Sequence, residues 1–505
     1  MSITESLTEP IGGTGLDAAT VTAAELGQAM CAGTLTAAGL TAFYLARIER
    51  LNPRLRAVIS VSALAAADAA GSDARRAAGQ ARGPLEGIPV LIKDNVSVAG
   101  LPATAGSPAL SAAGGGDAFI VAALRAAGAV VIGKANLSEW ANFRSRPSSS
   151  GWSTLGGQTV NPHGNGRNPS GSSSGSAVAV AAGLAPLAVG TETDGSIVSP
   201  AAVCGVVGIK PTVGLVSRSG IVPVSAAQDT AGPMARTVAD AAALLTAMAG
   251  PDSADPASAD SAGQAADYAS FLDPGALAGA RIGVWREGVD AAGPAAAAIL
   301  DAAVARLRGC GAEVVDPVDL PDADKLAAPE YASMLHEFKH DLNAYLATLP
   351  GEHPASLAEL IAFNRRHAAI VLAEFGQEIF EAAQATSGNP ADPDYLSGRA
   401  QVRRLARGGL DAALSGSRLA AVVSLTCGPA WLTDHVLGDH YAGGTSSPAA
   451  VAGYPAISLP AGQFRGLPVG ISLVGPAWSE PRLIALAHAF EQAGQPVQGP
   501  GAARG

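Results

Sequence analysis

The stretch GSSSGSAVAVAAGLAPLAVGTETDGSI, residues 171–197, joins two serine- and glycine-rich loops through an apolar segment. Small apolar residues from Gly175 to Gly183 indicate a helix, and Leu187 to Gly190 indicates a short strand. Ser172 precedes the helix, and Ser196 follows the strand in a glycine turn. A serine attacks an amide at neutral pH only when another group removes its proton, so two such serines suggest a proton relay. No histidine stands near either serine in the sequence, so the base must come from another segment.

The sequence around this unit alternates between strand-like and helical patterns. Further strands are predicted at residues 88–92, 129–132, 203–209, 281–285, 312–318, 419–425 and 469–474. Helical patterns cover most of residues 20–81 and recur at 119–127, 237–248, 295–307 and 481–493. This alternation predicts an α/β fold, with a mixed, mostly parallel, twisted β-sheet covered by helices on both faces.

The chain is expected to form a single large domain over residues 18–495, with its core at about 84–245. Residues 1–17 are polar and rich in glycine, which predicts a loose N-terminal arm, and residues 496–505 form a tail. From about 325 to 414 the pattern is helical without strand signals, which indicates an insertion into the domain. We hypothesise that this insertion forms part of a substrate pocket.

Composition excludes several classes of function. The formal net charge of −11 argues against nucleic acid or an anionic membrane as a partner. The most apolar stretch, residues 177–190, is too short to span a bilayer, and the N-terminus shows no secretory signal. The four cysteines show no paired spacing that would indicate a disulfide framework or a zinc ribbon. We therefore expect a soluble, cytoplasmic protein.

Lys93 is a candidate for the missing base. It ends the apolar run 88–92, and a lysine with apolar surroundings can lose its proton because desolvation lowers its pKa. Only five of the 32 basic residues are lysines, and three of them fall between residues 90 and 210, together with the two serines. A salt-bridged surface lysine is the commoner fate of this residue type, so the pattern alone leaves both interpretations open.

The turn Thr193-Asp194-Gly195 directly precedes Ser196. A tight turn with glycine at this place lets successive backbone N–H groups converge ahead of the serine hydroxyl. Such a group of donors can bind the oxyanion of a tetrahedral intermediate.

Two other motifs suggest different chemistry. Residues 171–175 fit the nucleophile-elbow pattern G-x-S-x-G with Ser173 as nucleophile, but the preceding residues 161–170 read as a turn-rich loop instead of the strand that an elbow requires. His336-Glu337-Phe338-Lys339-His340 matches the zinc motif H-E-x-x-H on a predicted helix, with Glu359 as a conceivable third ligand. A zinc-dependent peptidase that uses His336, Glu337 and His340 is therefore an alternative function, although it leaves Lys93 and the two serines without a role.

Several separated motifs resemble the amidase signature family. They are the strand end at Lys93-Asp94, the serine run 171–176, the segment 193–197, the block 201–236 and the tail motifs GYPAISLP at 453–460 and GLPVG at 466–470. The resemblance runs from about residue 20 to 495. It implies the fold of that family, a Ser–cis-Ser–Lys triad, and no metal or cofactor.

Carried over residue by residue, the resemblance implies that Ser196 is the nucleophile, Ser172 the bridging serine on a cis peptide bond, and Lys93 the base. The backbone N–H groups of Thr193, Asp194 and Gly195 would form the oxyanion hole.

Within the family, residues 137–144 and 190–198 are most similar to the bacterial peptide amidases, which release ammonia from C-terminally amidated peptides. Many relatives carry arginine where this chain has Val198, which favours the peptide amidase branch. The expected substrates are thus peptide amides or amino-acid amides, hydrolysed through an acyl-enzyme by a monomer or a small homo-oligomer. An amidotransferase-type subunit that acts on glutamine with a partner remains an alternative.

Overall fold

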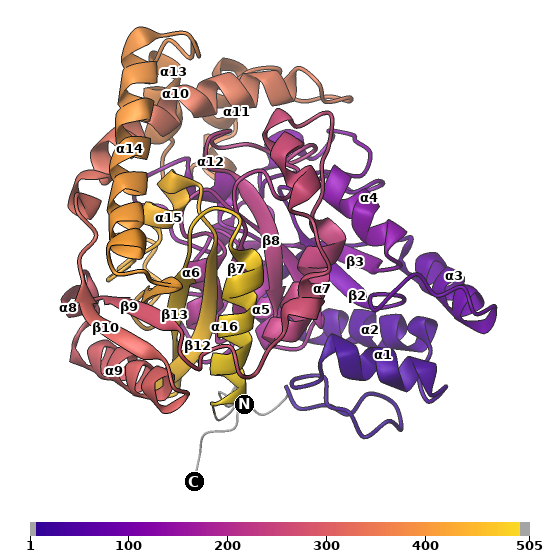
Figure 1. Cartoon of the computed structure of the whole chain (residues 1–505). Coiled ribbons are helices and arrows are strands. Elements are labelled where there is room, and N and C mark those ends of the chain that lie inside the picture. Colours follow the sequence, from indigo (N-terminus) through magenta and orange to yellow (C-terminus); the bar gives the residue numbers. More distant parts are fainter. Residues whose placement is uncertain (1–6, 495–505) are drawn as a thin grey trace.

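The computed structural model describes residues 7–494, and an eleven-stranded sheet forms the centre of this part of the chain (Figure 1). Across the sheet the strands are β1 (Val58–Val61), β3 (Val130–Ala135), β2 (Pro89–Lys93), β6 (Leu187–Glu192), β8 (Thr230–Ala235), β7 (Val207–Lys210), β12 (Ala456–Phe464), β13 (Leu467–Val474), β11 (Ala421–Leu425), β9 (Arg281–Trp285) and β10 (Glu313–Val318). A separate hairpin pairs β4 (Trp152–Ser153) with β5 (Gly157–Gln158).

The sheet is mixed, but the expectation that it is mostly parallel is wrong. Within residues 7–494, β2 runs parallel to β3 and β6, and β9 runs parallel to β10 and β11. The other six of the ten pairings are antiparallel. Three strands of this sheet with antiparallel partners, β1, β8 and β12, were not predicted. In β8 and β12, internal glycine and proline (TAGPMA and AISLPAGQF) hide the strand pattern.

Other boundaries differ from the predictions locally. The predicted strand at 203–209 begins later, because helix α6 (Val198–Cys204) takes up its first residues. The predicted helical region 20–81 is interrupted by β1. The turn that joins β12 to β13 has positive φ at Arg465 (52°) and Gly466 (78°), which suits a two-residue hairpin and makes this pair antiparallel.

Helices cover both faces of the sheet, as predicted. α5 (Ser174–Ala181) and α6 pack together on one face, and α7 (Val238–Met248), α9 (Pro294–Gly309) and α16 (Glu480–Gln492) pack on the other. The remaining helices of this part are α1 (Ala23–Cys31), α2 (Ala37–Leu55), α3 (Ala65–Ala77), α4 (Phe119–Ala126), α8 (Val289–Ala292) and α15 (Ser447–Ala452), with 3₁₀ segments at Pro108–Leu110, Glu139–Asn142, Pro256–Gly263, Tyr268–Phe271 and Ala323–Lys325. The core between these layers consists mainly of Ala, Val, Leu and Ile side chains.

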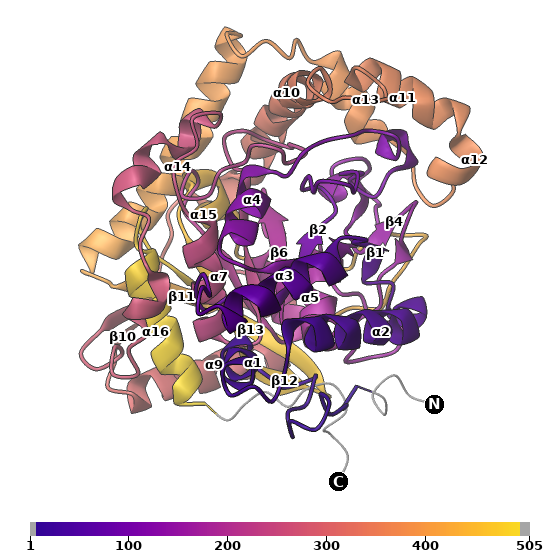
Figure 2. The same cartoon turned by 90° about the vertical axis from the view of Figure 1, so that its right-hand side faces the viewer.

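The region 325–414, predicted to be helical, forms helices α10 to α14 at one end of the molecule, far from the N-terminal helices (Figures 1 and 2). They are α10 (Ala327–Leu346), α11 (Leu357–Arg366), α12 (Ala368–Val371), α13 (Glu378–Ala385) and α14 (Pro393–Gly416). Phe338 and Phe380 of this insertion are buried in one cluster with Trp140 and Phe143. The insertion is therefore packed onto the rest of the domain.

The structure of the N-terminal residues differs from the predicted loose arm. Residues 1–6 and the predicted tail 496–505 lie outside the described residues. Within 7–17, however, Leu7 and Ile11 are buried in the main core, and the carbonyl of Leu7 accepts a hydrogen bond from buried Arg47. This part of the arm is packed and not loose, because its few apolar residues find places in the core.

Among the described helices, none is both long enough and apolar enough to cross a bilayer. The four cysteines are free thiols.

Candidate active site

The predicted base and nucleophile lie at the ends of adjacent strands. Lys93 is the last residue of β2, and Ser196 follows β6 in the short connection to α6. Because β2 and β6 are parallel neighbours, their carboxyl ends meet at one edge of the sheet. Ser172 stands just before α5, which packs across β2 and β6.

Lys93 is fully buried, and its side-chain nitrogen is surrounded by oxygen atoms. Lys93 Nζ lies 2.8 Å from Ser172 Oγ and 2.9 Å from Ser173 Oγ. Thr191 adds its carbonyl oxygen at 3.1 Å and its hydroxyl at 2.9 Å. No carboxylate lies within salt-bridge distance of Lys93 among residues 7–494. The side chain therefore has hydrogen-bond partners but no counter-ion in contact.

The donors and acceptors around Lys93 suit a neutral amine, which has two N–H donors and one lone pair. The carbonyl of Thr191 can only accept. The Ser173 hydroxyl donates to that same carbonyl at 3.0 Å, so its oxygen accepts from Lys93. With these two oxygens as acceptors for both N–H groups of a neutral amine, its lone pair is left for the hydroxyl protons of Thr191 and Ser172. Ser172 Oγ, at 2.8 Å, is placed to supply such a proton.

Burial lowers the pKa of Lys93 from 10.5 to about 7. Desolvation is the main cause, since removal from water penalises the charged form. The carboxylates of Glu192 and Asp229 oppose this effect from a distance. A substantial neutral fraction at physiological pH follows, which a proton acceptor needs.

The two predicted catalytic serines differ in exposure and contacts. Ser172 is fully buried, whereas Ser196 is 8% exposed. The Gly171–Ser172 peptide bond is cis, at the place where the family resemblance implies one. Ser173 N–H donates to the carbonyl of Ser196 at 3.1 Å, which ties the two loops together. Within residues 7–494 the Ser196 hydroxyl has no hydrogen-bond partner, so the structure shows no bond between the Ser172 and Ser196 hydroxyls.

The segment 193–195, which we call the oxyanion loop, presents free backbone donors. Residues 7–494 supply no acceptor for the N–H groups of Asp194, Gly195 or Ser196. Gly195 has φ +75°, and a Cβ there would lie 2.9 Å from Ser446 Oγ, so only glycine fits easily. Unpaired backbone N–H groups beside a serine hydroxyl can bind a developing oxyanion.

Side chains on both sides hold the oxyanion loop. Glu192, buried beneath it, accepts hydrogen bonds from the N–H groups of Ile197 at 2.7 Å and Val198 at 3.0 Å. The Asp194 carboxylate accepts from the hydroxyls of Ser446 at 2.5 Å and Ser447 at 2.6 Å, at the start of α15. The loop is thus anchored at its base and at its side chain.

Sequence reasoning missed three residues of this site. Ser173 and Thr191 contact Lys93 directly, and Asn95 Nδ2 donates to Thr191 Oγ1 at 2.9 Å. Ser173 was singled out only as an elbow nucleophile, Asn95 follows Lys93-Asp94, and Thr191 is the next-to-last residue of β6, just before the oxyanion loop. Their positions were visible in the sequence, but their contacts depend on the strand register.

The elbow motif at 171–175 and the H-E-x-x-H motif at 336–340 form other contacts than those that their chemistry would require. Ser173 is fully buried, and no strand precedes it directly, so an exposed elbow nucleophile is not formed. Glu337 is held by Arg399, whose Nε and Nη2 lie 2.6 and 2.5 Å from its two oxygens. His336 stacks on Tyr395, and His340 pairs with Asp341 at 2.8 Å. Over residues 7–494 no three His, Cys, Asp or Glu side chains are arranged to hold a metal ion, and Glu337 is engaged by Arg399, so the arrangement does not favour the zinc-peptidase alternative.

Comparison with known sequences gives consistent matches over most of the chain. A sequence model described as Amidase matches residues 39–484. A probable amidase of Arabidopsis thaliana is 41% identical over 471 residues, which are 91% of this chain and 87% of the relative. A glutamyl-tRNA(Gln) amidotransferase subunit of Symbiobacterium thermophilum is 36% identical over 485 residues, 94% of this chain and 96% of the relative.

Solved structures are similar over nearly their whole length. The native peptide amidase from Stenotrophomonas maltophilia superposes with a TM-score of 0.90 at 50% identity, covering 95% of this chain and 99% of its own. A peptide amidase in complex with the competitive inhibitor chymostatin superposes with a TM-score of 0.93 at 51% identity, with the same coverage.

Proposed function

Because the chain belongs to the amidase signature family of amide hydrolases, we propose that it releases ammonia from C-terminally amidated peptides or amino-acid amides. Ser196 is the nucleophile, Ser172 the bridging serine and Lys93 the base. The observation that carries the proposal is a buried Lys93 at 2.8 Å from Ser172, beside the N–H groups of Asp194, Gly195 and Ser196, for which residues 7–494 supply no acceptor.

The reaction begins with a proton relay. Neutral Lys93 takes the proton of Ser172 Oγ while Ser172 takes the proton of Ser196 Oγ, and Ser196 attacks the amide carbon. The oxyanion forms against the N–H groups of Thr193, Asp194 and Gly195. The proton then returns through Ser172 to the leaving nitrogen, so that ammonia departs and an acyl-enzyme remains. Water attacks the acyl-enzyme by the same relay and releases the carboxylic acid.

Preference for peptide amides rests on two observations. The peptide amidase structures are 50–51% identical to this chain, whereas the amidotransferase relative is 36% identical. Val198 is buried in an apolar cluster with Trp285 and Tyr454, a setting unsuited to the arginine that many relatives carry there. The role of the insertion in substrate binding, the cytoplasmic location and the oligomeric state stay predictions.

We expect the purified chain alone to release ammonia from an N-acetylated peptide amide with a kcat of about 1 s⁻¹ or more, a usual value for enzymes. Free glutamine should react at least about 100-fold more slowly in kcat/KM. A panel of peptide amides, amino-acid amides, aryl amides and glutamine, assayed by ammonia release, checks this. Activity on glutamine that appears only with a partner protein would instead support the amidotransferase alternative.

The value of kcat/KM should rise with pH through a single group with a midpoint near 7. The value rises with pH because Lys93 acts as the base: protonated Lys93 has no lone pair, so the proton relay stops below the pKa of Lys93. The nearby Asp229 carboxylate raises the pKa of Lys93, so Asp229→Asn should move the midpoint downward without removing the acid limb. A pH–rate profile of both proteins checks this prediction, and a limb that disappears in Asp229→Asn would identify the carboxylate as the titrating group.

A further inference from the structure

The turn 225–229 lies between the oxyanion loop and the helical insertion. Gln228 Nε2 donates to the carbonyl of Thr193 at 3.3 Å, and Thr193 Oγ1 donates to the Asp229 carboxylate at 2.5 Å. Two consecutive residues of the turn therefore hold the backbone and the side chain of Thr193.

The contact with the Thr193 carbonyl has a geometric consequence. In a trans peptide the C=O and the following N–H point in opposite directions. When Gln228 fixes the carbonyl of Thr193 on one side, it turns the N–H of Asp194 toward the other. That N–H is one of the unpaired donors ahead of Ser196. Gln228 thus acts on the direction of an oxyanion-hole donor without touching the reacting atoms.

The insertion fixes the orientation of the Gln228 side chain, which is fully buried. Arg399 of α14 can only donate, and its Nη1 lies 2.7 Å from Gln228 Oε1. Glu330 of α10 accepts from Gln228 Nε2 at 2.8 Å. The amide oxygen must therefore face Arg399, and the amide nitrogen must face Glu330 and the Thr193 carbonyl.

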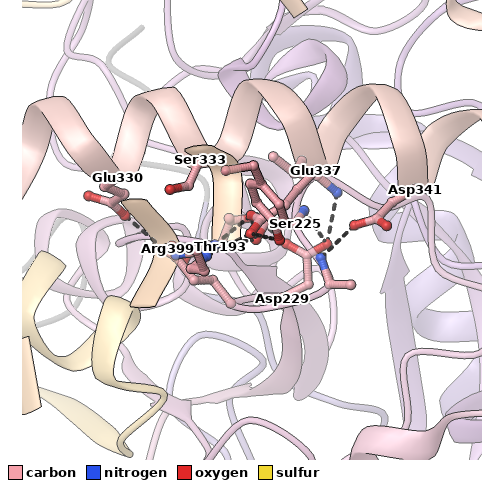
Figure 3. A network of polar contacts seen from close by, with 12 residues as sticks. Thr193, Ser225, Asp229, Glu330, Ser333, Glu337, Asp341 and Arg399 are labelled. Carbon is pink, nitrogen blue, oxygen red and sulfur yellow. Dashed lines mark hydrogen bonds and ion pairs between the residues drawn. The ribbon is translucent and has the colours of Figure 1, made fainter. Parts of the chain in front are cut away.

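The insertion also contacts the turn 225–229 through other side chains. Arg399 forms a two-pronged ion pair with Glu337, and Ser225 Oγ donates to Glu337 at 2.6 Å. Asp341 accepts from the N–H of Ala226 at 2.7 Å. Glu330, Glu337 and Asp341 follow one another at intervals of seven and four residues, so they project from one face of α10 toward the turn (Figure 3).

We propose that Gln228 is a positioning residue for the oxyanion hole, and that helices α10 and α14 hold it in place through Glu330 and Arg399. The inference rests on the proposed function of the oxyanion loop. It gives the insertion a role in the chemical step, distinct from any role in binding substrate.

Gln228→Met tests the proposal, since methionine has a similar length but cannot hold the Thr193 carbonyl. We expect kcat for the N-acetylated peptide amide to fall by about 10- to 100-fold, less than the loss of a whole oxyanion donor, with KM within about threefold. The Kd of the peptide amide, measured in a Ser196→Ala background, should not change. Gln377→Met is the matched control: Gln377 is a buried glutamine of the same insertion that bonds Asn364 and Glu381. Its kcat should stay within about twofold.

A second pair of variants separates the effect of Arg399 on Gln228 from its ion pair with Glu337. In Arg399→Lys the single ammonium can keep the ion pair with Glu337 but cannot also reach Gln228, so kcat should fall by about 5- to 50-fold. The control is Arg404→Lys on the exposed side of α14, which should leave kcat unchanged. If Arg399 acts through Gln228, the double variant should be no slower than the slower single variant. Arg399→Lys also provides the test if Gln228→Met fails to fold.

Unchanged kcat in Gln228→Met, or a change in KM alone, would overturn the proposal. Additive losses in the double variant would also overturn the link through Arg399. The same variants are assayed with p-nitrophenyl acetate, whose tetrahedral intermediate needs the same oxyanion donors. A wild-type protein that cleaves the ester but no amide would refute the peptide-amidase function, while the ester kinetics would still decide the role of Gln228.

Discussion

Replacement of Ser196 with alanine should lower kcat for ammonia release by about 10⁴-fold or more and leave the fold intact. The loss is large because the members of a nucleophile–relay–base unit act together, and removal of the nucleophile disables all of them. Stability should change little, because the Ser196 hydroxyl has no hydrogen bond within the described residues and the side chain reaches solvent. Ammonia release and the thermal midpoint of unfolding measure the two effects.

The matched control is Ser176→Ala. Ser176 is a fully buried serine of α5 whose hydroxyl donates to the carbonyl of Val189 at 2.9 Å. This variant should lose about 1 kcal/mol of stability, the usual contribution of one hydrogen bond, and keep kcat within about threefold. If Ser196→Ala kept more than a tenth of wild-type activity, another residue would have to be the nucleophile.

Replacement of Lys93 with methionine should lower kcat by about 10³-fold or more, because the relay then has no acceptor for the Ser172 proton. Methionine fills a similar volume without the amine. Lys339→Met serves as the control, since Lys339 is a lysine of α10 that bonds the carbonyls of Gln384 and Thr386, and its activity should stay within about threefold. Substantial turnover by Lys93→Met, or loss of wild-type turnover in EDTA, would contradict the mechanism and revive a metal-dependent one.

The stability of the same variant relative to the wild type should depend on pH. The pKa of Lys93 is about 7 in the folded chain and 10.5 when unperturbed, so between these values the unfolded chain binds the extra proton. This lysine therefore lowers the free energy of unfolding, and the loss grows as the pH falls from 10.5 toward 7. Methionine removes the effect. The difference in thermal midpoint between Lys93→Met and wild type should accordingly increase from pH 10 to pH 7.

Local patterns predicted much of the fold. The helix and strand that flank the serine loops, the strand that ends at Lys93 and the helical insertion all occur where composition and periodicity place them. Strands β8 and β12 could not be predicted in this way, since glycine and proline break their apolar runs and only the neighbouring strands identify them. These two strands account for much of the antiparallel pairing, so missing them led to the wrong expectation of a mostly parallel sheet.

The candidate site was only partly predictable for a related reason. Lys93, Ser172 and Ser196 were singled out by their loops and by the family resemblance, but the contact of Lys93 with Thr191 spans 98 positions. The bond between Gln228 and Arg399 spans 171 positions and joins a loop to an inserted helix. Contacts of this kind follow from the packing of distant elements, and no local spacing encodes them.

The central claim is that Ser196 carries the acyl group during turnover. The most direct measurement is mass spectrometry of the enzyme quenched in acid while it turns over an N-acetylated peptide amide, followed by mapping of the digested protein. The account predicts an adduct of the mass of the acyl group on the peptide that contains Ser196, absent in Ser196→Ala. An adduct on another residue, or full turnover without any adduct and with undiminished activity in Ser196→Ala, would contradict it.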